Sequence, residues 1–330
     1  MKLKKVGKSN VEVTEIAFGA WAVGGWMWGG TDYKLSVKAI ERAIDLGMTT
    51  IDTAPAYGFG LSEKMVGEAI KGKKDKVQVL TKYGLRWDTE KGKFFFPSTS
   101  NEGKPARMHR YASKDGVFSE CEESLKRLGI ECIDLYQIHW PDPTTPIEET
   151  MEAIDLLIQQ GKIKASGVCN YTVDEMKKAD SVVPLASNQV PYSMVKRDIE
   201  KDVVLFCLKN DIGILAYSPL HRGLLTGKIT PDYRFKEGDT RSNLPFYRGE
   251  NLIKINHFLQ KIKTIADDRR ISLTQLVIKW TMKQPGITCV LVGARSPEQV
   301  DENIQAAGFE LTDEEIDIIN GELDKLKLDG

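Results

Sequence analysis

The chain has 330 residues, of which 41% are hydrophobic and 28% are charged, and its formal net charge is −1. This composition is typical of a soluble globular protein, and a charge so close to zero indicates no general attraction to nucleic acid or to a membrane surface. No stretch approaches the roughly 20 apolar residues of a membrane span. No apolar segment follows the basic start Met1–Lys5, so a signal peptide is not expected either.

Cysteine and histidine spacing indicates neither a disulfide framework nor a metal site. The cysteines show no C-x-x-C pair, and the four histidines form no H-x-x-x-H pair. An odd number of cysteines in a long chain is typical of a reducing compartment, so we expect a cytoplasmic protein without bound metal. The cysteines are Cys121, Cys132, Cys169, Cys207 and Cys289.

Strand-like and helix-like segments alternate along the chain. A hairpin with its turn at Gly7–Asn10 is predicted first. Apolar strand-like segments then begin near residues 16, 48, 77, 133, 163, 186, 212 and 288, and nearly all are followed by a segment with helical spacing. The last amphipathic helix is predicted at about 312–327.

This alternation predicts the fold class. Buried strands that alternate with helices form parallel sheets, and eight such units in about 300 residues match a (β/α)8 TIM barrel, for which ~250 residues is typical. A doubly wound sheet is the alternative, but its Gly-rich G-x-G-x-x-G turn does not occur in the sequence. We therefore predict a single α/β domain with a hairpin cap at about 1–14, a barrel at about 15–310 and the C-terminal helix.

Three connections between the predicted elements are long. They are the Gly/Trp-rich segment after Trp21, the segment Tyr83–Lys114 and the segment Pro219–Glu250. The last two are rich in Gly, Pro, Ser and charged residues, and we expect all three to be loops. In a barrel such loops project from the face that carries active sites.

Four polar residues are predicted to meet on that face. Asp52, Lys82 and His139 each follow or end a different strand, and Tyr57 lies in the turn after Asp52. An ammonium beside a phenol lowers the phenol pKa from ~10, and a carboxylate keeps that ammonium charged. His139 can hydrogen-bond a substrate oxygen. The set predicts a proton donor to a carbonyl oxygen that gains negative charge.

Several short motifs extend this set along nearly the whole chain. They are D-x-A-x-x-Y-G at Asp52–Gly58, T-K at Thr81–Lys82, D-L-Y-x-I-H at Asp134–His139, G-K-I-x-x-x-G-V-x-N at Gly161–Asn170, N-Q at Asn188–Gln189, Y-S-P-L at Tyr217–Leu220 and G-A-R-x-P-E-Q-x-x-x-N at Gly293–Asn303. In this order, over about residues 16–310, the sequence resembles the aldo-keto reductase family. It is most similar to the bacterial general-stress and Tas-like branches, and also to potassium-channel β-subunits.

The resemblance implies a TIM barrel that uses NADPH/NADP+, with NADH as the alternative, and has no Rossmann fold. It implies that Tyr57 is the general acid, that Lys82 and Asp52 tune it, and that His139 orients the carbonyl. By the resemblance, Asn170 and Gln189 would hold the nicotinamide carboxamide, and Tyr217 would stack on the nicotinamide ring. Backbone amides after Ser218, through Leu220, Gly223 and Leu225, would wrap the pyrophosphate. The adenosine end would be held by Gly293, Arg295, Gln299 and Asn303. The implied cofactor-binding residues are Trp21, Asp52, Cys169, Asn170, Gln189, Tyr217, Ser218, Pro219, Leu220, Arg222, Gly223, Leu225, Lys228, Gly293, Arg295, Gln299 and Asn303.

Two positions depart from the pattern of the family. Cys169 stands where the family usually has serine, and a thiol is a weaker hydrogen-bond partner than a hydroxyl. Gly293 stands where vertebrate members carry a lysine that contacts the 2′-phosphate. The resemblance therefore leaves Arg295 as the phosphate partner, which predicts a preference for NADPH. The substrate-binding residues are predicted to be Trp21, Trp26, Tyr57, Trp87, His139 and Trp140.

Three functions fit these residues. The first is a reductase of small aldehydes or ketones. The second is a nucleotide-binding subunit of the channel β-subunit type, which can keep the same four polar residues; the short segment before the first predicted strand favours the enzyme. The third is a Schiff-base aldolase that uses Lys82. It ranks last because it does not need Asn170, Gln189 and Arg295.

Overall fold

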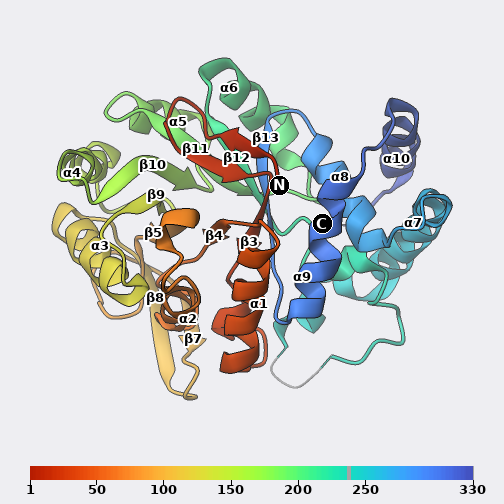
Figure 1. The fold of residues 1–330 in the computed structure, drawn as a ribbon, viewed down its shortest axis with the longest axis horizontal. Helices are drawn as coiled ribbons and strands as arrows, with labels where there is room; N and C mark the ends of the chain where they lie inside the picture. The colour runs from red at the N-terminus through yellow and green to blue at the C-terminus, as the bar shows by residue number, and fades with distance from the viewer. Residues whose placement is uncertain (236–238, 330) are drawn as a thin grey trace.

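The computed structural model describes residues 1–235 and 239–329. In this part of the chain, eight parallel strands close into a barrel in the order β3-β4-β5-β9-β10-β11-β12-β13. Figure 1 labels these strands on the ribbon. The predicted TIM barrel is thus confirmed, and its strands begin close to the predicted positions. The strands are β3 (Ile16–Gly19), β4 (Thr50–Asp52), β5 (Gln78–Tyr83), β9 (Ile133–Ile138), β10 (Ile163–Cys169), β11 (Leu185–Pro191), β12 (Gly213–Tyr217) and β13 (Ile287–Val292).

Helices surround the barrel (Figure 1). Among the described residues, none of them has the length and apolar character needed to cross a membrane. The helices are α1 (Tyr33–Asp45), α2 (Leu61–Ala69), α3 (Lys114–Leu128), α4 (Ile147–Gln159), α5 (Val173–Asp180), α6 (Val203–Asn210), α7 (Gly249–Asp268), α8 (Leu273–Lys283), α9 (Pro297–Ile304) and α10 (Asp313–Lys325). Short 3-10 turns lie at Ala22–Gly24, Lys74–Lys76, Asp198–Lys201, Leu224–Thr226, Thr240–Asn243, Pro245–Tyr247 and Gln305–Gly308.

Local sequence explains where several helices begin. Thr172, Ser272 and Thr312 each accept a hydrogen bond from the backbone N–H three residues later, and the Glu or Gln at that later position bonds back. These reciprocal capping boxes satisfy N–H groups that have no partner within the helix. They set the starts of α5, α8 and α10.

The predicted N-terminal hairpin closes the end of the barrel opposite the carboxyl ends of the strands. It consists of β1 (Leu3–Lys5) and β2 (Glu12–Thr14), drawn in red in Figure 1. Its valines Val6, Val11 and Val13 are buried in one apolar cluster with side chains from inside the barrel. Gly7 has φ +51°, and a Cβ there would lie 2.5 Å from the carbonyl oxygen of Ala186. The close approach to the barrel rim therefore requires glycine.

We predicted that the segment Tyr83–Lys114 is a loop, and this prediction is wrong. The segment forms an antiparallel sheet of β6 (Leu85–Arg86), β7 (Lys93–Thr99) and β8 (Pro105–Arg110), in the order β6-β8-β7. A register shift between Phe94 and Phe96 interrupts the alternation along β7, and Pro97 adds a second irregularity. Because of these irregularities, the sequence of β7 lacks the period-two alternation that would have predicted a strand. The regular structure of Pro219–Glu250, among its described residues, consists of short 3-10 turns and the first two residues of α7; residues 236–238 lie outside the described residues.

Candidate active site

The carboxyl ends of the barrel strands open into a cavity of about 570 Å³. Its lining comes from the strand tips, from the loop after β3, from β7, from the loop after β12 and from the start of α9. Of the four predicted catalytic residues, Asp52, Tyr57 and His139 line the cavity, and Lys82 contacts two of them from the barrel interior. The predicted convergence of strand ends thus brings the four side chains together.

Lys82 and Asp52 form an ion pair at the bottom of the cavity. The Lys82 ammonium donates to Asp52 Oδ1 at 2.6 Å and to the carbonyl oxygen of Thr53 at 2.9 Å. Burial by itself lowers the pKa of an ammonium, but the carboxylate of Asp52 and the neighbouring Tyr57 outweigh it, so the pKa of Lys82 lies above its ordinary value. Lys82 is therefore a cation at neutral pH.

Tyr57 lies directly above this pair. The Lys82 Nζ atom is 4.9 Å from the centroid of the Tyr57 ring. Burial raises the pKa of Tyr57 to about 12, with Lys82 opposing the rise and Asp52 adding to it. Lys82 therefore acts in the predicted direction, but the prediction of a lowered phenol pKa is wrong for this structure because desolvation of the phenolate is larger. Tyr57 is a protonated phenol at neutral pH.

Two glycines hold the turn that carries Tyr57. A Cβ on Gly24 would lie 2.9 Å from the backbone of Tyr57, and a Cβ on Gly58 would lie 2.2 Å from the carbonyl oxygen of Gly24. Gly58 also has φ +67°, which glycine adopts without strain. The backbones of the loop after β3 and the turn after β4 thus touch, and this contact sets the height of the phenol above Lys82.

His139 faces Tyr57 across the cavity floor. The two ring centroids are 5.6 Å apart at 81°. Burial, together with the charge of Lys82, holds the pKa of His139 well below its ordinary value. Its imidazole is therefore neutral and carries one N–H donor and one acceptor.

Two side-chain amides line the cavity with defined orientations. Asn170 donates through Nδ2 to the carbonyl oxygen of His139 at 3.1 Å, and its Oδ1 accepts the Tyr217 hydroxyl at 3.0 Å. Gln189 donates through Nε2 to Asp52 Oδ2 at 2.8 Å. Neighbouring polar groups thus decide which end of each amide faces the cavity.

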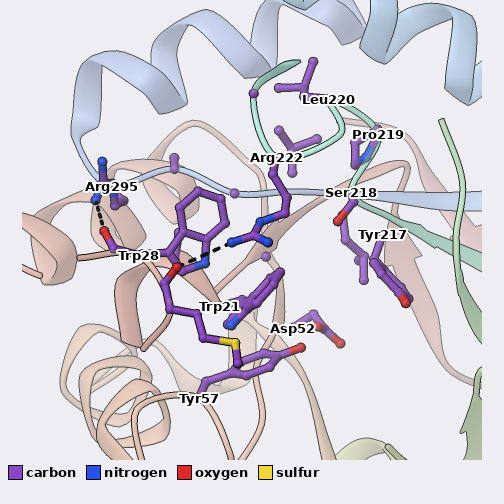
Figure 2. Close-up of a pocket in the computed structure, with 18 of the residues that line it drawn as sticks. Trp21, Trp28, Asp52, Tyr57, Tyr217, Ser218, Pro219, Leu220, Arg222 and Arg295 are labelled. Atoms are coloured by element: carbon purple, nitrogen blue, oxygen red, sulfur yellow. Dashed lines mark hydrogen bonds between the residues drawn. The ribbon is translucent and has the colours of Figure 1, made fainter. Parts of the chain in front are cut away.

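The loop after β12 forms a curled wall over the cavity. Ser218, His221 and Arg222 all have positive φ, and Gly223 has φ +91°. The guanidinium of Arg222 lies 5.2 Å from the rings of both Trp21 and Trp28, and Figure 2 shows Arg222 extending from its loop toward these two rings. It connects this loop to the loop after β3.

Buried donors on the loops after β3 and β12 suit an anion. The indole Nε1 of Trp21, the indole Nε1 of Trp28 and the Nε of Arg222 are buried and have no hydrogen-bond partner within the described ranges. Buried N–H groups are almost always paired in native proteins, so these donors along one cavity suit a ligand with acceptor oxygens. The diphosphate of a dinucleotide supplies acceptor oxygens of this kind.

The predicted adenosine end lies at the start of α9. The backbone N–H of Arg295 donates to Gln299 Oε1 at 2.8 Å, and the amide of Asn303 reaches the carbonyl oxygen of Gly293 at 3.4 Å. The Arg295 guanidinium is exposed and donates to the carbonyl oxygen of Trp28 at 3.3 Å, drawn as a dashed line in Figure 2. Arg295 also lines the cavity.

Most predicted cofactor residues line the cavity, but Leu225 does not. Its side chain is fully buried, and its backbone N–H donates to the carbonyl oxygen of Leu220, as does that of Gly223. Turn hydrogen bonds thus occupy both of these amides, which the resemblance assigns to the pyrophosphate. The residues that do line it are Trp21, Asp52, Cys169, Asn170, Gln189, Tyr217, Ser218, Pro219, Leu220, Arg222, Gly223, Lys228, Gly293, Arg295, Gln299 and Asn303.

The substrate side of the cavity is more aromatic than the sequence predicted. Trp21, Trp26 and Trp140 line it, but Trp87 does not, because its ring packs edge-on against Phe59 at 5.3 Å. Sequence reasoning missed Phe95 and Phe96 of β7, which also line the cavity. Phe96 stacks on Trp26 at 6.2 Å, and Phe95 lies 5.2 Å from Trp140. The run of three phenylalanines was the available signal.

The cavity contains no cluster that suits a metal. Across residues 1–235 and 239–329, no group of three or more His, Cys, Asp or Glu side chains is placed to hold a metal ion. The five cysteines are free thiols, and Cys169 lies in the cavity wall. Burial raises the pKa of the Cys169 thiol, so it stays protonated.

Comparisons with known proteins agree with this geometry. The model of the Aldo/keto reductase family matches residues 15–324. The chain is 39% identical to the aldo-keto reductase YhdN of Bacillus subtilis, covering 97% of this chain and 93% of that protein. It is 34% identical to the NADH-specific methylglyoxal reductase of Escherichia coli, covering 95% of each.

Solved structures agree as well. The glycerol dehydrogenase AKR11B4 from Gluconobacter oxydans superposes with a TM-score of 0.88 at 38% identity, covering 99% of this chain and 96% of that one. The aldo-keto reductase AKR11C1 from Bacillus halodurans gives a TM-score of 0.78 at 27% identity, covering 98% and 96%. The family match, the two relatives and the barrel with its polar floor lead to one conclusion: this chain is a member of the aldo/keto reductase family of oxidoreductases, which act on carbonyl compounds with NAD(P)H.

Proposed function

We propose that this protein reduces aldehydes or ketones to alcohols with NADPH, and that Tyr57 supplies the proton. The observation that carries the proposal is the protonated Tyr57 phenol above the buried Lys82–Asp52 pair, beside a neutral His139. The five free cysteines support action in a reducing compartment such as the cytoplasm. We propose that the protein acts as a single barrel domain.

The cofactor fits the wall and floor of the cavity. Gln189 and Asn170 would hold the carboxamide, Tyr217 would face the nicotinamide ring, and the unpaired donors of Arg222 and the two indoles would face the diphosphate. When bound, NADPH supplies the hydride that reduces the carbonyl carbon.

Residues of this chain stabilise the negative charge that develops on the carbonyl oxygen and supply its proton. Negative charge on that oxygen draws the Tyr57 proton, and the Lys82 ammonium stabilises the phenolate that remains. Asp52 keeps Lys82 charged and in place through the 2.6 Å contact. His139, being neutral, can donate a hydrogen bond to the same oxygen without adding a second positive charge beside Lys82. Trp21, Trp26 and Phe96 line the cavity and would shield the bound carbonyl group from water.

The preference for NADPH rests on Arg295. Its exposed guanidinium has five N–H donors, and the contact to the Trp28 carbonyl uses one of them. A guanidinium grips a phosphate through paired hydrogen bonds, which favours a cofactor with a 2′-phosphate. The relative from Escherichia coli is named NADH-specific, so the family as a whole does not fix this choice.

Lys82 also argues against an aldolase. Schiff-base formation needs a neutral amine as the nucleophile. Here Asp52 and Tyr57 raise the pKa of Lys82 above its ordinary value despite burial, so the amine stays protonated. The same charge that suits a phenolate partner disfavours nucleophilic attack.

A cofactor titration followed by a carbonyl panel tests the proposal. Wild-type protein is titrated with NADPH and NADH, and NADPH oxidation is then followed with aliphatic and aromatic aldehydes, including a nitrobenzaldehyde. We expect tight binding of NADPH and measurable reduction of the reactive aldehyde. Binding without reduction of any carbonyl would instead favour a nucleotide-binding subunit.

A further inference from the structure

Gln137 is a buried amide inside the barrel to which neither sequence motifs nor family resemblance assign a role. It lies on β9, its side chain is fully buried, and it pairs in register with Lys82 of β5 and Gly167 of β10. A Cβ on Gly167 would lie 2.8 Å from Gln137 Cγ. The missing side chain of Gly167 therefore gives Gln137 its space.

Gln137 contacts the predicted catalytic residue Asp52 and the predicted cofactor-binding residue Gln189. Its Nε2 lies 3.5 Å from Asp52 Oδ2 as a long hydrogen bond, and its Oε1 accepts from Gln189 Nε2 at 3.4 Å. Gln189 Nε2 donates to Asp52 Oδ2 at 2.8 Å as well. The three side chains form a closed triangle of donors and acceptors.

This triangle permits one orientation of the Gln189 amide. Its nitrogen end faces two acceptors, the Asp52 carboxylate and the Gln137 carbonyl oxygen. A flipped Gln189 would set its own oxygen against both of them, and a buried acceptor without a donor is costly. Gln137 thus adds a second acceptor that favours the nitrogen-inward orientation.

The consequence appears on the cavity side. With its nitrogen inward, Gln189 turns its oxygen, an acceptor, toward the cavity that it lines. Asn170 uses one Nδ2 hydrogen on the His139 carbonyl oxygen, and its second is a donor. One acceptor and one donor side by side are complementary to a primary carboxamide.

We propose that Gln137 is a positioning residue: it orients the amide of Gln189 so that the site selects a pyridine ring that carries a primary carboxamide. This inference rests on the proposed function, because it concerns the dinucleotide that the cavity would hold. Gln137 itself touches neither cofactor nor substrate, since it does not line the cavity.

The test compares two cofactors that differ at one group. Dissociation constants are measured by quenching of tryptophan fluorescence for reduced NADPH and for its 3-acetylpyridine analogue, in which a methyl group replaces the amide NH2. Wild type should bind NADPH more tightly. In Gln137→Met, which keeps the length but removes both hydrogen bonds, the ratio of the two constants should fall about two- to tenfold. Gln137→Asn, too short to make either contact, should behave alike.

Ser187→Ala is the matched control. Ser187 Oγ lies in the same layer, 2.6 Å from where a Cβ on Gly167 would be, and has no hydrogen-bond partner in the described part of the chain. Its ratio should equal that of wild type, and melting curves check that all variants fold.

The outcomes separate the two proposals. A wild type that binds neither dinucleotide overturns the proposed function and this inference with it. A wild type that discriminates, with Gln137 variants that discriminate equally well, overturns the inference alone. Equal binding of both dinucleotides by wild type also overturns it.

Discussion

The Lys82 ammonium and the Asp52 carboxylate lie 2.6 Å apart at the bottom of the cavity, with side chains 1% and 4% exposed. Neither ion has much access to water, so each depends on the other for compensation of its charge. The pair therefore links the stability of the barrel to the chemistry of Tyr57 above it.

Replacing Lys82 should damage both properties. Lys82→Met leaves a buried, unpaired carboxylate below Tyr57, and we expect a loss of about 3–5 kcal/mol in the free energy of unfolding and a loss of turnover as large as that of Tyr57→Phe. Chemical denaturation and NADPH-oxidation assays measure the two effects. The double variant Asp52→Asn/Lys82→Met should regain stability but not activity.

A borohydride trap accompanies this prediction. Wild-type protein is incubated with carbonyl substrate and borohydride and then analysed by mass spectrometry. We expect no adduct on Lys82. Covalent capture of substrate there would support the aldolase and contradict the reductase mechanism.

Tyr57→Phe should remove the proton donor and leave the cofactor site in place. We expect kcat for a reactive aldehyde to fall by about 10²–10⁴-fold, as for loss of a general acid, with the Kd for NADPH nearly unchanged. Tyr136→Phe is the control, because Tyr136 is also buried and its hydroxyl has no partner among the residues described. Near wild-type kcat in Tyr57→Phe at neutral pH would refute the general-acid role.

Arg295→Ala should change the choice of cofactor. A charge-assisted contact to the 2′-phosphate contributes on the order of 1.5–3 kcal/mol, so wild type should prefer NADPH over NADH by roughly ten- to a hundredfold, and the variant should lose most of this ratio. Lys38→Ala on α1, also exposed, controls for the loss of a surface charge. An unchanged ratio in Arg295→Ala would remove Arg295 from the phosphate site.

Glu120 on α3 should make stability depend on pH. It is buried and accepts the N–H of Gly84 at 3.1 Å, and Arg86 lies 3.7 Å away. Burial raises the pKa of Glu120 to about 8, although Arg86 and the Gly84 N–H oppose the rise. Between about pH 4.3 and 8 the folded state therefore holds a proton that the unfolded state has lost, so stability falls as pH rises through this window.

Glu120→Gln replaces the titratable carboxyl group by an amide, so the dependence of stability on pH should disappear. At pH 9 the variant should be more stable than wild type by on the order of 4 kcal/mol, and at pH 5 the two should be nearly equal. Melting curves between pH 5 and 9 check both values. Glu123→Gln, an exposed position on the same helix, should leave the wild-type dependence intact. A parallel pH dependence in wild type and Glu120→Gln would show that Glu120 does not titrate in this window.

Much of the fold was predictable from local patterns. Alternating apolar strands and amphipathic helices predicted the barrel, and the position of Asp52, Lys82 and His139 at strand ends predicted their meeting. The three-stranded sheet within Tyr83–Lys114 was not predictable in this way, because the bulge at Phe94–Phe96 and Pro97 break the period-two pattern. Phe95 and Phe96, which line the cavity from this sheet, were therefore not predicted either.

The sequence by itself determined which element each catalytic side chain sits on, since helix and strand periods and strand ends are local properties. The tertiary structure alone decided what surrounds those side chains. Burial raises the Tyr57 pKa although Lys82 is adjacent, and closure of the barrel brings Gln137 of β9 to Gln189 of β11 and Asp52 of β4. Desolvation and contacts between distant strands depend on the packed volume around a group, which no local pattern along the chain encodes.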